Sequence, residues 1–147
     1  MVSRNIRDYP TKAKRTNKAK HRIVITSFEQ QTAELNDKEL EIIPFLIKGF
    51  SSHSEDNPIK APVIVRQMND FLAKNNKGIK MNEPRLRKCV NYIRSNSILP
   101  LIATSDGYYV SQDHEVIKSQ IKSLRERASS ISKCADGLSV FIPTNNL

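Results

Sequence analysis

In this 147-residue chain, the side chains that are best suited to binding a partner lie in residues 82–96. We predict a helix here whose buried stripe comprises Leu86, Val90 and Ile93, supported by Cys89. The opposite side and its flanks then carry Arg85, Arg87, Lys88, Asn91 and Arg94. Arginine and lysine bind phosphates, arginine also pairs with guanine, and asparagine pairs with adenine. This pattern favours a helix that contacts a nucleic acid, and an ordinary solvated helix face is the alternative.

The charge of the whole chain is consistent with a polyanionic partner. Lys and Arg number 24 against 15 Asp and Glu, which gives a net charge of +9. Residues 1–22 and 60–94 each have a net charge of +7, residues 23–59 have −5, and residues 95–147 are neutral. Basic blocks of this kind attract polyanions such as nucleic acids. Three lysines in the predicted turn before residues 82–96 extend the second basic block: Lys74, Lys77 and Lys80.

The first basic block, residues 1–22, is predicted to form an extended N-terminal arm, because it has almost no apolar residues between Pro10 and His21. Its basic side chains include Lys12, Lys14, Arg15, Lys18, Lys20 and Arg22. Such an arm either tracks nucleic-acid phosphates or serves only as a solubilising or localising segment. A short β-branched run at 23–28 predicts a strand.

Two helices should precede residues 82–96. Asn36 stands three residues before Glu39, a spacing typical of a capping box, and predicts a helix over 37–49 that ends at Gly49. The expected buried residues are Leu40, Ile43, Leu46 and Ile47.

A second helix should begin at Ala61, with Pro62 in its first turn, and end near Lys74. Its apolar residues recur at helical spacing: Ile64, Val65, Met68, Phe71 and Leu72. The helix over 82–96 then follows a short connection that contains glycine, with Asn82 as its N-cap.

Residues 97–112 predict a β-hairpin, because Asp106-Gly107 separates two runs that favour strands. We expect a type I′ turn, in which both central residues have positive φ. The hairpin contains no Lys or Arg, so its candidate phosphate contacts are hydroxyl groups. These belong to Thr104, Ser105 and Tyr108.

The longest predicted helix covers about 113–136, and residues 137–147 form a C-terminal extension with a candidate strand at 138–143. The apolar residues of this helix step by 4, 3, 4 and 3 residues: Ile117, Ile121, Leu124, Ala128 and Ile131. This stripe either packs on the rest of the domain, which its length of about three heptads favours, or pairs with a second copy through 113–135.

The order helix, helix, turn, basic helix and hairpin over residues 36–112 resembles a winged helix-turn-helix. The segment Glu83–Val110, which ends in Pro-Leu-Ile-Ala-Thr-Ser-Asp-Gly-Tyr-Tyr-Val, is similar to small winged-helix proteins of phages and prophages. The resemblance implies an α+β, mainly helical fold: a domain over 23–112 with three helices and a hairpin wing, followed by a long C-terminal helix. It also implies that the third helix enters the major groove of DNA, in transcription regulation or replication.

Other function classes find little support. The chain lacks a glycine-rich phosphate loop, a nucleophile elbow and a zinc-protease motif, so we expect no enzyme and no cofactor. Two cysteines, Cys89 and Cys134, and three histidines do not form a metal-binding pattern, and we expect both thiols to be free and at least half-buried.

No apolar run is long enough to cross a membrane and the N-terminus lacks a signal peptide, so we expect a cytoplasmic protein, in the host cytoplasm if a phage encodes it. Double-stranded DNA is the expected partner. The alternative is a structural or adaptor protein of a phage particle or replication complex, which uses the same scaffold and the basic arm for protein contacts.

Overall fold

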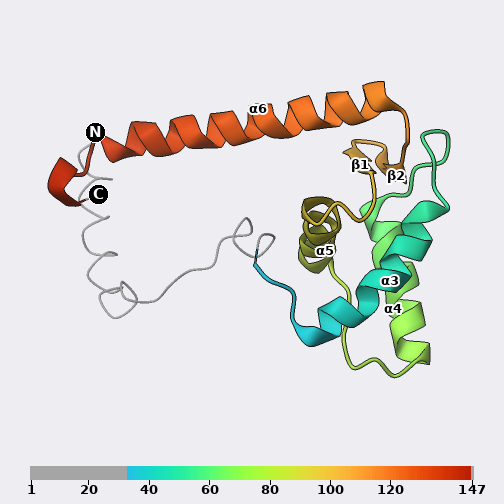
Figure 1. Cartoon of the computed structure of the whole chain (residues 1–147). Helices are drawn as coiled ribbons and strands as arrows, with labels where there is room; N and C mark the ends of the chain where they lie inside the picture. Colours follow the sequence, from blue (N-terminus) through green and yellow to red (C-terminus); the bar gives the residue numbers. More distant parts are fainter. Residues whose placement is uncertain (1–32, 147) are drawn as a thin grey trace, which may run out of the picture.

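A computed structural model describes residues 33–146. The predicted N-terminal arm and the predicted strand at 23–28 lie outside the described residues. Within the described range the chain is α+β and mainly helical, with four α-helices and one two-stranded antiparallel sheet (Figure 1). The order is α3 (Asp37–Ser51), α4 (Ala61–Lys74), α5 (Glu83–Ser95), β1 (Leu101–Thr104), β2 (Gly107–Val110), α6 (His114–Ser139) and the short 3-10 helix η2 (Thr144–Asn146).

Helix α3 begins with the predicted capping box. The Asn36 side chain accepts from the Glu39 amide, and the Glu39 carboxylate accepts from the Asn36 amide. The predicted buried face is partly wrong, because Leu40 is 41% exposed and Ile42 is fully buried. The helix also continues past Gly49 to Ser51.

Helices α4 and α5 agree closely with prediction. Ile64, Met68 and Leu72 of α4 are buried, and the buried stripe of α5 is Leu86, Cys89, Val90 and Ile93. The Asn69 side chain of α4 donates to the Met81 carbonyl at 3.0 Å and accepts from its amide at 2.7 Å. This pair of bonds fixes the chain just before α5 and therefore fixes where α5 starts.

The predicted hairpin is confirmed, but its predicted turn type is wrong. Thr104 pairs with Gly107, so Ser105 and Asp106 are the central turn residues, and neither has a positive φ. Gly107 has a φ of +128° instead. Ile59, just before α4, pairs with Tyr108 through two hydrogen bonds of 2.9 and 2.8 Å. A Cβ at position 107 would lie 2.6 Å from the Ile59 carbonyl oxygen, which explains the glycine.

Helix α6 differs most from prediction. It continues through Gly137 to Ser139, so the candidate strand at 138–143 is wrong. Figure 1 shows α6 leaving the hairpin and projecting beyond α3, α4 and α5. None of its residues is buried, and Cys134 is exposed, contrary to expectation, whereas Cys89 is buried as expected. Within the described residues, the apolar stripe of α6 is therefore exposed after Ile117.

Candidate nucleic-acid interface

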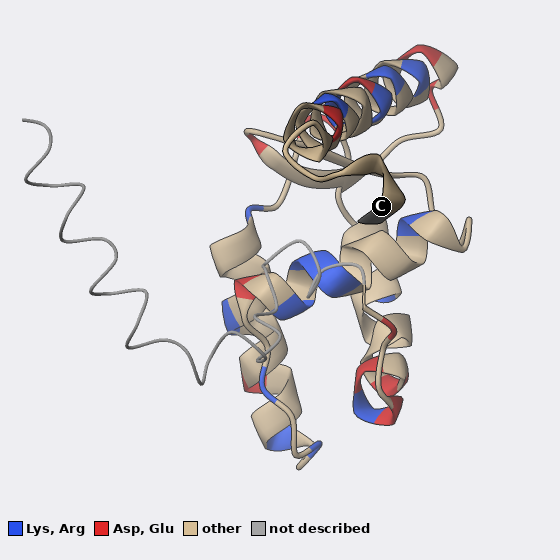
Figure 2. Cartoon of the chain, turned by 90° about the vertical axis from the view of Figure 1, so that its left-hand side faces the viewer, with Lys and Arg blue, Asp and Glu red and all other residues tan. Residues whose placement is uncertain are grey.

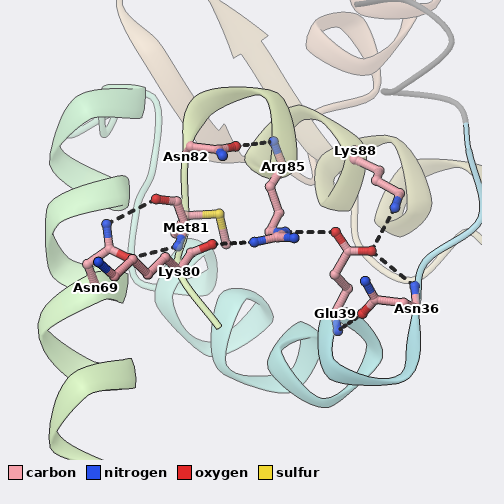
Figure 3. A network of polar contacts seen from close by, with 8 residues as sticks. All are labelled: Asn36, Glu39, Asn69, Lys80, Met81, Asn82, Arg85 and Lys88. Carbon is pink, nitrogen blue, oxygen red and sulfur yellow. Dashed lines mark hydrogen bonds and ion pairs between the residues drawn. The ribbon is translucent and has the colours of Figure 1, made fainter. Parts of the chain in front are cut away.

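A buried carboxylate binds the side chains of two residues that were predicted to contact nucleic acid. Glu39, 2% exposed, accepts hydrogen bonds from Arg85 Nε at 2.8 Å and from Lys88 Nζ at 2.7 Å (Figure 3). Arg85 also donates through Nη1 to the Lys80 carbonyl. These bonds tie the first turn of α3 to α5 and to the connection that precedes α5.

The ionised form of Glu39 is the stable one in this network. Burial by itself raises the pKa of its carboxyl group, but hydrogen bonds from Lys88, the Asn36 amide and Arg85 outweigh burial. The pKa is therefore lowered from its ordinary value. Removal of Glu39 would leave two cations without this partner, and removal of either cation would leave the buried carboxylate with only one, so the network holds α3 to α5.

Arg85 and Lys88 are consequently positioning residues for the fold. The expectation that Lys88 is exposed opposite the buried stripe is wrong, because its side chain is only 16% exposed. A lysine stem is long enough to reach from an outward position on α5 to the carboxylate of a neighbouring helix.

Arg94 is also engaged inside the molecule. Its Nε donates to the Leu101 carbonyl at 3.0 Å, and its Nη2 donates to Gln120 Oε1 at 3.0 Å. The same Gln120 oxygen accepts from the Ala103 amide at 2.6 Å. Burial, followed by the nearby charge of Arg127, lowers the pKa of Arg94, and Tyr108 acts in the opposite direction. Arg94 and Gln120 thus join α5, β1 and α6, a role that the sequence analysis did not assign to either.

Two predicted contacts on α5 are still accessible. Asn91 is exposed, and Arg87 is partly exposed with a weak ion pair to Glu83, four residues earlier, at 3.9 Å. Both point away from the buried stripe of α5. They are the residues on this helix whose polar groups suit an external partner.

The connection between α4 and α5 adds positive charge beside them. Lys74 and Lys80 are exposed, while Lys77 lies over the Phe45 ring, 5.7 Å from its centroid. Lys38, which the sequence analysis missed, reaches this connection from α3 and donates to the Gly78 carbonyl at 3.2 Å. Figure 2 shows Lys and Arg positions in blue along the ribbon of α5 and of this connection.

The hairpin offers fewer side chains for phosphate contacts than predicted. The Thr104 hydroxyl accepts from the Asp106 amide at 3.2 Å and donates to the Gly107 carbonyl at 3.3 Å, so it closes the turn. Tyr108 packs against the Phe50 ring at 5.6 Å between centroids, and burial raises the pKa of its hydroxyl. Ser105 is exposed.

A groove separates α5 and the hairpin from α6. Its volume is about 460 Å³, and Arg87, Asn91 and Arg94 line it on the α5 side. Leu124, Arg127, Ala128 and Ile131 line it on the α6 side. A groove of this size accommodates side chains, and a DNA duplex cannot lie inside it. Arg87 and Asn91 therefore face α6 across this groove, and a duplex would have to reach them from the open side of the groove.

Three further findings concern metal ligands, the Cys89 thiol and membrane spans among the described residues. Residues 33–146 contain no group of three His, Cys, Asp or Glu side chains that could hold a metal ion. Burial raises the pKa of the Cys89 thiol to about 12, which makes it a poor nucleophile. No helix among the described residues is long and apolar enough to span a membrane.

Comparisons of this chain with models of protein families, with curated proteins and with solved structures find no match. The resemblance to winged-helix proteins therefore stays a prediction. The basic side chains of residues 1–22 lie outside the described residues.

Proposed function

We propose that this chain is a winged helix-turn-helix protein that binds duplex DNA, in transcription control or in replication. Support for the winged helix comes from the order of elements. Three helices precede an antiparallel hairpin, and a backbone segment between the first two helices pairs with the hairpin through Ile59. Helix–turn–helix pairs of this kind use their second helix, here α5, for DNA recognition.

The observation that carries the proposal is the exposed side of α5 next to its preceding connection. Arg87 and Asn91 are the two residues of the predicted set on α5 that no buried partner occupies among the described residues. Lys74 and Lys80 stand exposed on the connection just before them. Arginine and asparagine can read base edges, and the lysines would neutralise flanking phosphates.

The contact that we propose uses Arg87 in the N-terminal half of α5 and Asn91 just past its middle. Recognition helices commonly contact bases with their N-terminal residues, so Arg87 is the better placed of the two for binding in the major groove. The hairpin, without Lys or Arg, would add at most a hydroxyl contact from Ser105.

The salt dependence of duplex binding tests this function. The full chain is titrated into a labelled duplex at several salt concentrations, and the anisotropy of the label gives the affinity. A synthetic peptide of residues 1–32 serves as the comparison, because this segment is basic enough to bind DNA by itself. We expect the full chain to bind more tightly and with a steeper salt dependence than the peptide. Equal affinity and equal salt dependence would contradict a role for α5.

A second candidate function is an adaptor that binds proteins. The apolar stripe of α6 favours it, because this stripe is exposed and unsuited to DNA. Gel filtration of the full chain with and without duplex separates the two functions, because an adaptor would elute at an unchanged volume when the duplex is added.

A further inference from the structure

Helix α6 carries a heptad seam that is half-buried at Ile117 and exposed at its later apolar positions, among the described residues. The apolar positions continue beyond the predicted stripe with unbroken spacings of 4 and 3 residues. The seam consists of Ile117, Ile121, Leu124, Ala128, Ile131, Ala135 and Leu138. Ile121 is 40% exposed, Ile131 54% and Leu138 69%. Such a seam over most of a 26-residue helix is the pattern by which two helices pair in a coiled coil.

The C-terminal end of α6 extends this apolar surface. Three residues directly after the helix are exposed: Val140, Phe141 and Ile142. These residues and Leu138 lie on the part of the chain that projects away from α3, α4 and α5 (Figure 1). Large exposed apolar groups on a projecting helix mark a surface that a partner covers.

We propose that two copies of this chain pair through α6 in antiparallel orientation. The C-terminal half of α6 in one copy would cover the groove between α5 and α6 in the other. Arg87 and Asn91 line the same groove, so this pairing would cover the α5 side chains of the proposed DNA contact. The pairing is therefore tested separately from DNA binding. It decides between the two interpretations of the α6 stripe in favour of pairing.

The attachment of α6 to the rest of the chain favours antiparallel pairing. Gln120 holds the first half of α6 to β1 and Arg94, so each first half has a folded domain beside it. A parallel pair would bring both domains to the same end. An antiparallel pair sets the projecting end of each α6, beyond the groove residues Ala128 and Ile131, against the first half of the other copy.

The sizes of the seam residues favour the same orientation. In a parallel pair, Ala128 and Ala135 would each face their own copies, and the small side chains would leave gaps. In the antiparallel register that we propose, Ala128 faces Ile131 of the other copy and Ala135 faces Leu124. A large residue then fills the space beside each alanine.

The charges beside the seam fit this register as well. Residues 114–127 of α6 have a net charge of +2, whereas residues 128–139 contain one Lys and one Asp and are neutral. Antiparallel pairing puts the basic half of each helix against the neutral half of the other. Arg125 then lies beside Ser132 of the other copy, and Arg127 beside its Cys134, so like charges do not face each other.

The oligomeric state of matched variants tests the pairing. Ile131→Asp places a carboxylate in the seam, and Ser130→Asp places one on the opposite side of the same helix. By light scattering after gel filtration, we expect wild type and Ser130→Asp to have the mass of two chains. Ile131→Asp should have the mass of one chain and should still unfold in a cooperative transition, because Ile131 is exposed in the single copy. A single-chain mass for wild type, or a two-chain mass for Ile131→Asp, would overturn the proposal.

A disulfide experiment tests the orientation. Arg127→Cys adds a thiol that should lie beside Cys134 of the other copy, whereas Ser130→Cys adds one on the solvent side. Under mild oxidation we expect a covalent dimer from Arg127→Cys in non-reducing electrophoresis, and much less from Ser130→Cys. Positions 127 and 134 in one helix are about 10 Å apart along the axis, too far for a bond within one chain. Equal yields from the two variants would overturn the antiparallel register.

Discussion

The contact between α3 and α5 engages charged side chains inside the molecule, whereas the surface of α6 exposes apolar ones. In the first region, Arg85 and Lys88 bind a buried carboxylate and are unavailable to a partner. In the second region, leucine and isoleucine at core-like spacing are exposed. Positive charge in the sequence therefore does not establish a binding surface, and an apolar stripe does not establish burial. What each residue meets in space decides between structure and binding.

The largest effect on stability is expected from breaking the ion pairs of Glu39 between α3 and α5. Glu39→Ala leaves Arg85 and Lys88 without their carboxylate and removes half of the capping box of α3. We expect a loss of about 3–5 kcal/mol in the free energy of unfolding, measured with urea. Glu41→Ala, two residues along on an exposed position of α3, is the control and should change little. Equal losses in both variants would mean that the ion pairs contribute nothing specific.

A smaller effect on stability is expected where Ile59, just before α4, pairs with the hairpin. Gly107→Ala combines a φ of +128° with a Cβ 2.6 Å from the Ile59 carbonyl oxygen. We expect a loss of about 1–3 kcal/mol in the free energy of unfolding. Gly137→Ala, in open space within α6, should leave this transition unchanged or raise the helicity slightly. A Gly107→Ala variant as stable as wild type would show that the Ile59 pairing is absent in solution.

The loss of stability in acid should come mainly from Glu39, in the contact between α3 and α5. Because the pKa of folded Glu39 is below its ordinary value of 4.5, its contribution to stability is present above that pH. The contribution is then lost as the pH falls below about 4.5 and through the lower pKa of the folded state. Glu39→Gln should flatten the decrease in unfolding free energy over this acid range, measured in urea at each pH. The same acid decrease in Glu39→Gln as in wild type would assign the response to other groups.

The sequence predicted well what local signals determine. Pro62 and Asn82 mark the starts of α4 and α5, and Asp106-Gly107 marks the hairpin, because caps and turns depend on neighbouring residues. The turn type was not predictable, because Ile59, far away in the sequence, fixes the conformation of Gly107. Gly137 was a misleading stop signal, since a helix interior tolerates a glycine at a modest cost.

The candidate site was only partly predictable for a related reason. Helical spacing placed Arg87 and Asn91 outside the buried stripe of α5, as the structure does, but it could not show that both line a groove beside α6. It could not show that Glu39, 46 residues before Arg85 and 49 before Lys88, would bind both side chains. It also could not show that Gln120 would bind Arg94 and bring α6 next to α5. Long-range contacts of this kind leave no local pattern.

The measurement that tests the central claim most directly is duplex affinity after removal of the two accessible side chains on α5. Arg87→Ala/Asn91→Ala is compared with wild type and with Lys48→Ala, an exposed lysine in the last turn of α3, at one salt concentration by fluorescence anisotropy. We expect the double variant to bind duplex DNA about 10–100-fold more weakly, with unchanged unfolding, and Lys48→Ala to bind almost as tightly as wild type. Affinity in the double variant equal to that of Lys48→Ala would contradict duplex recognition by α5.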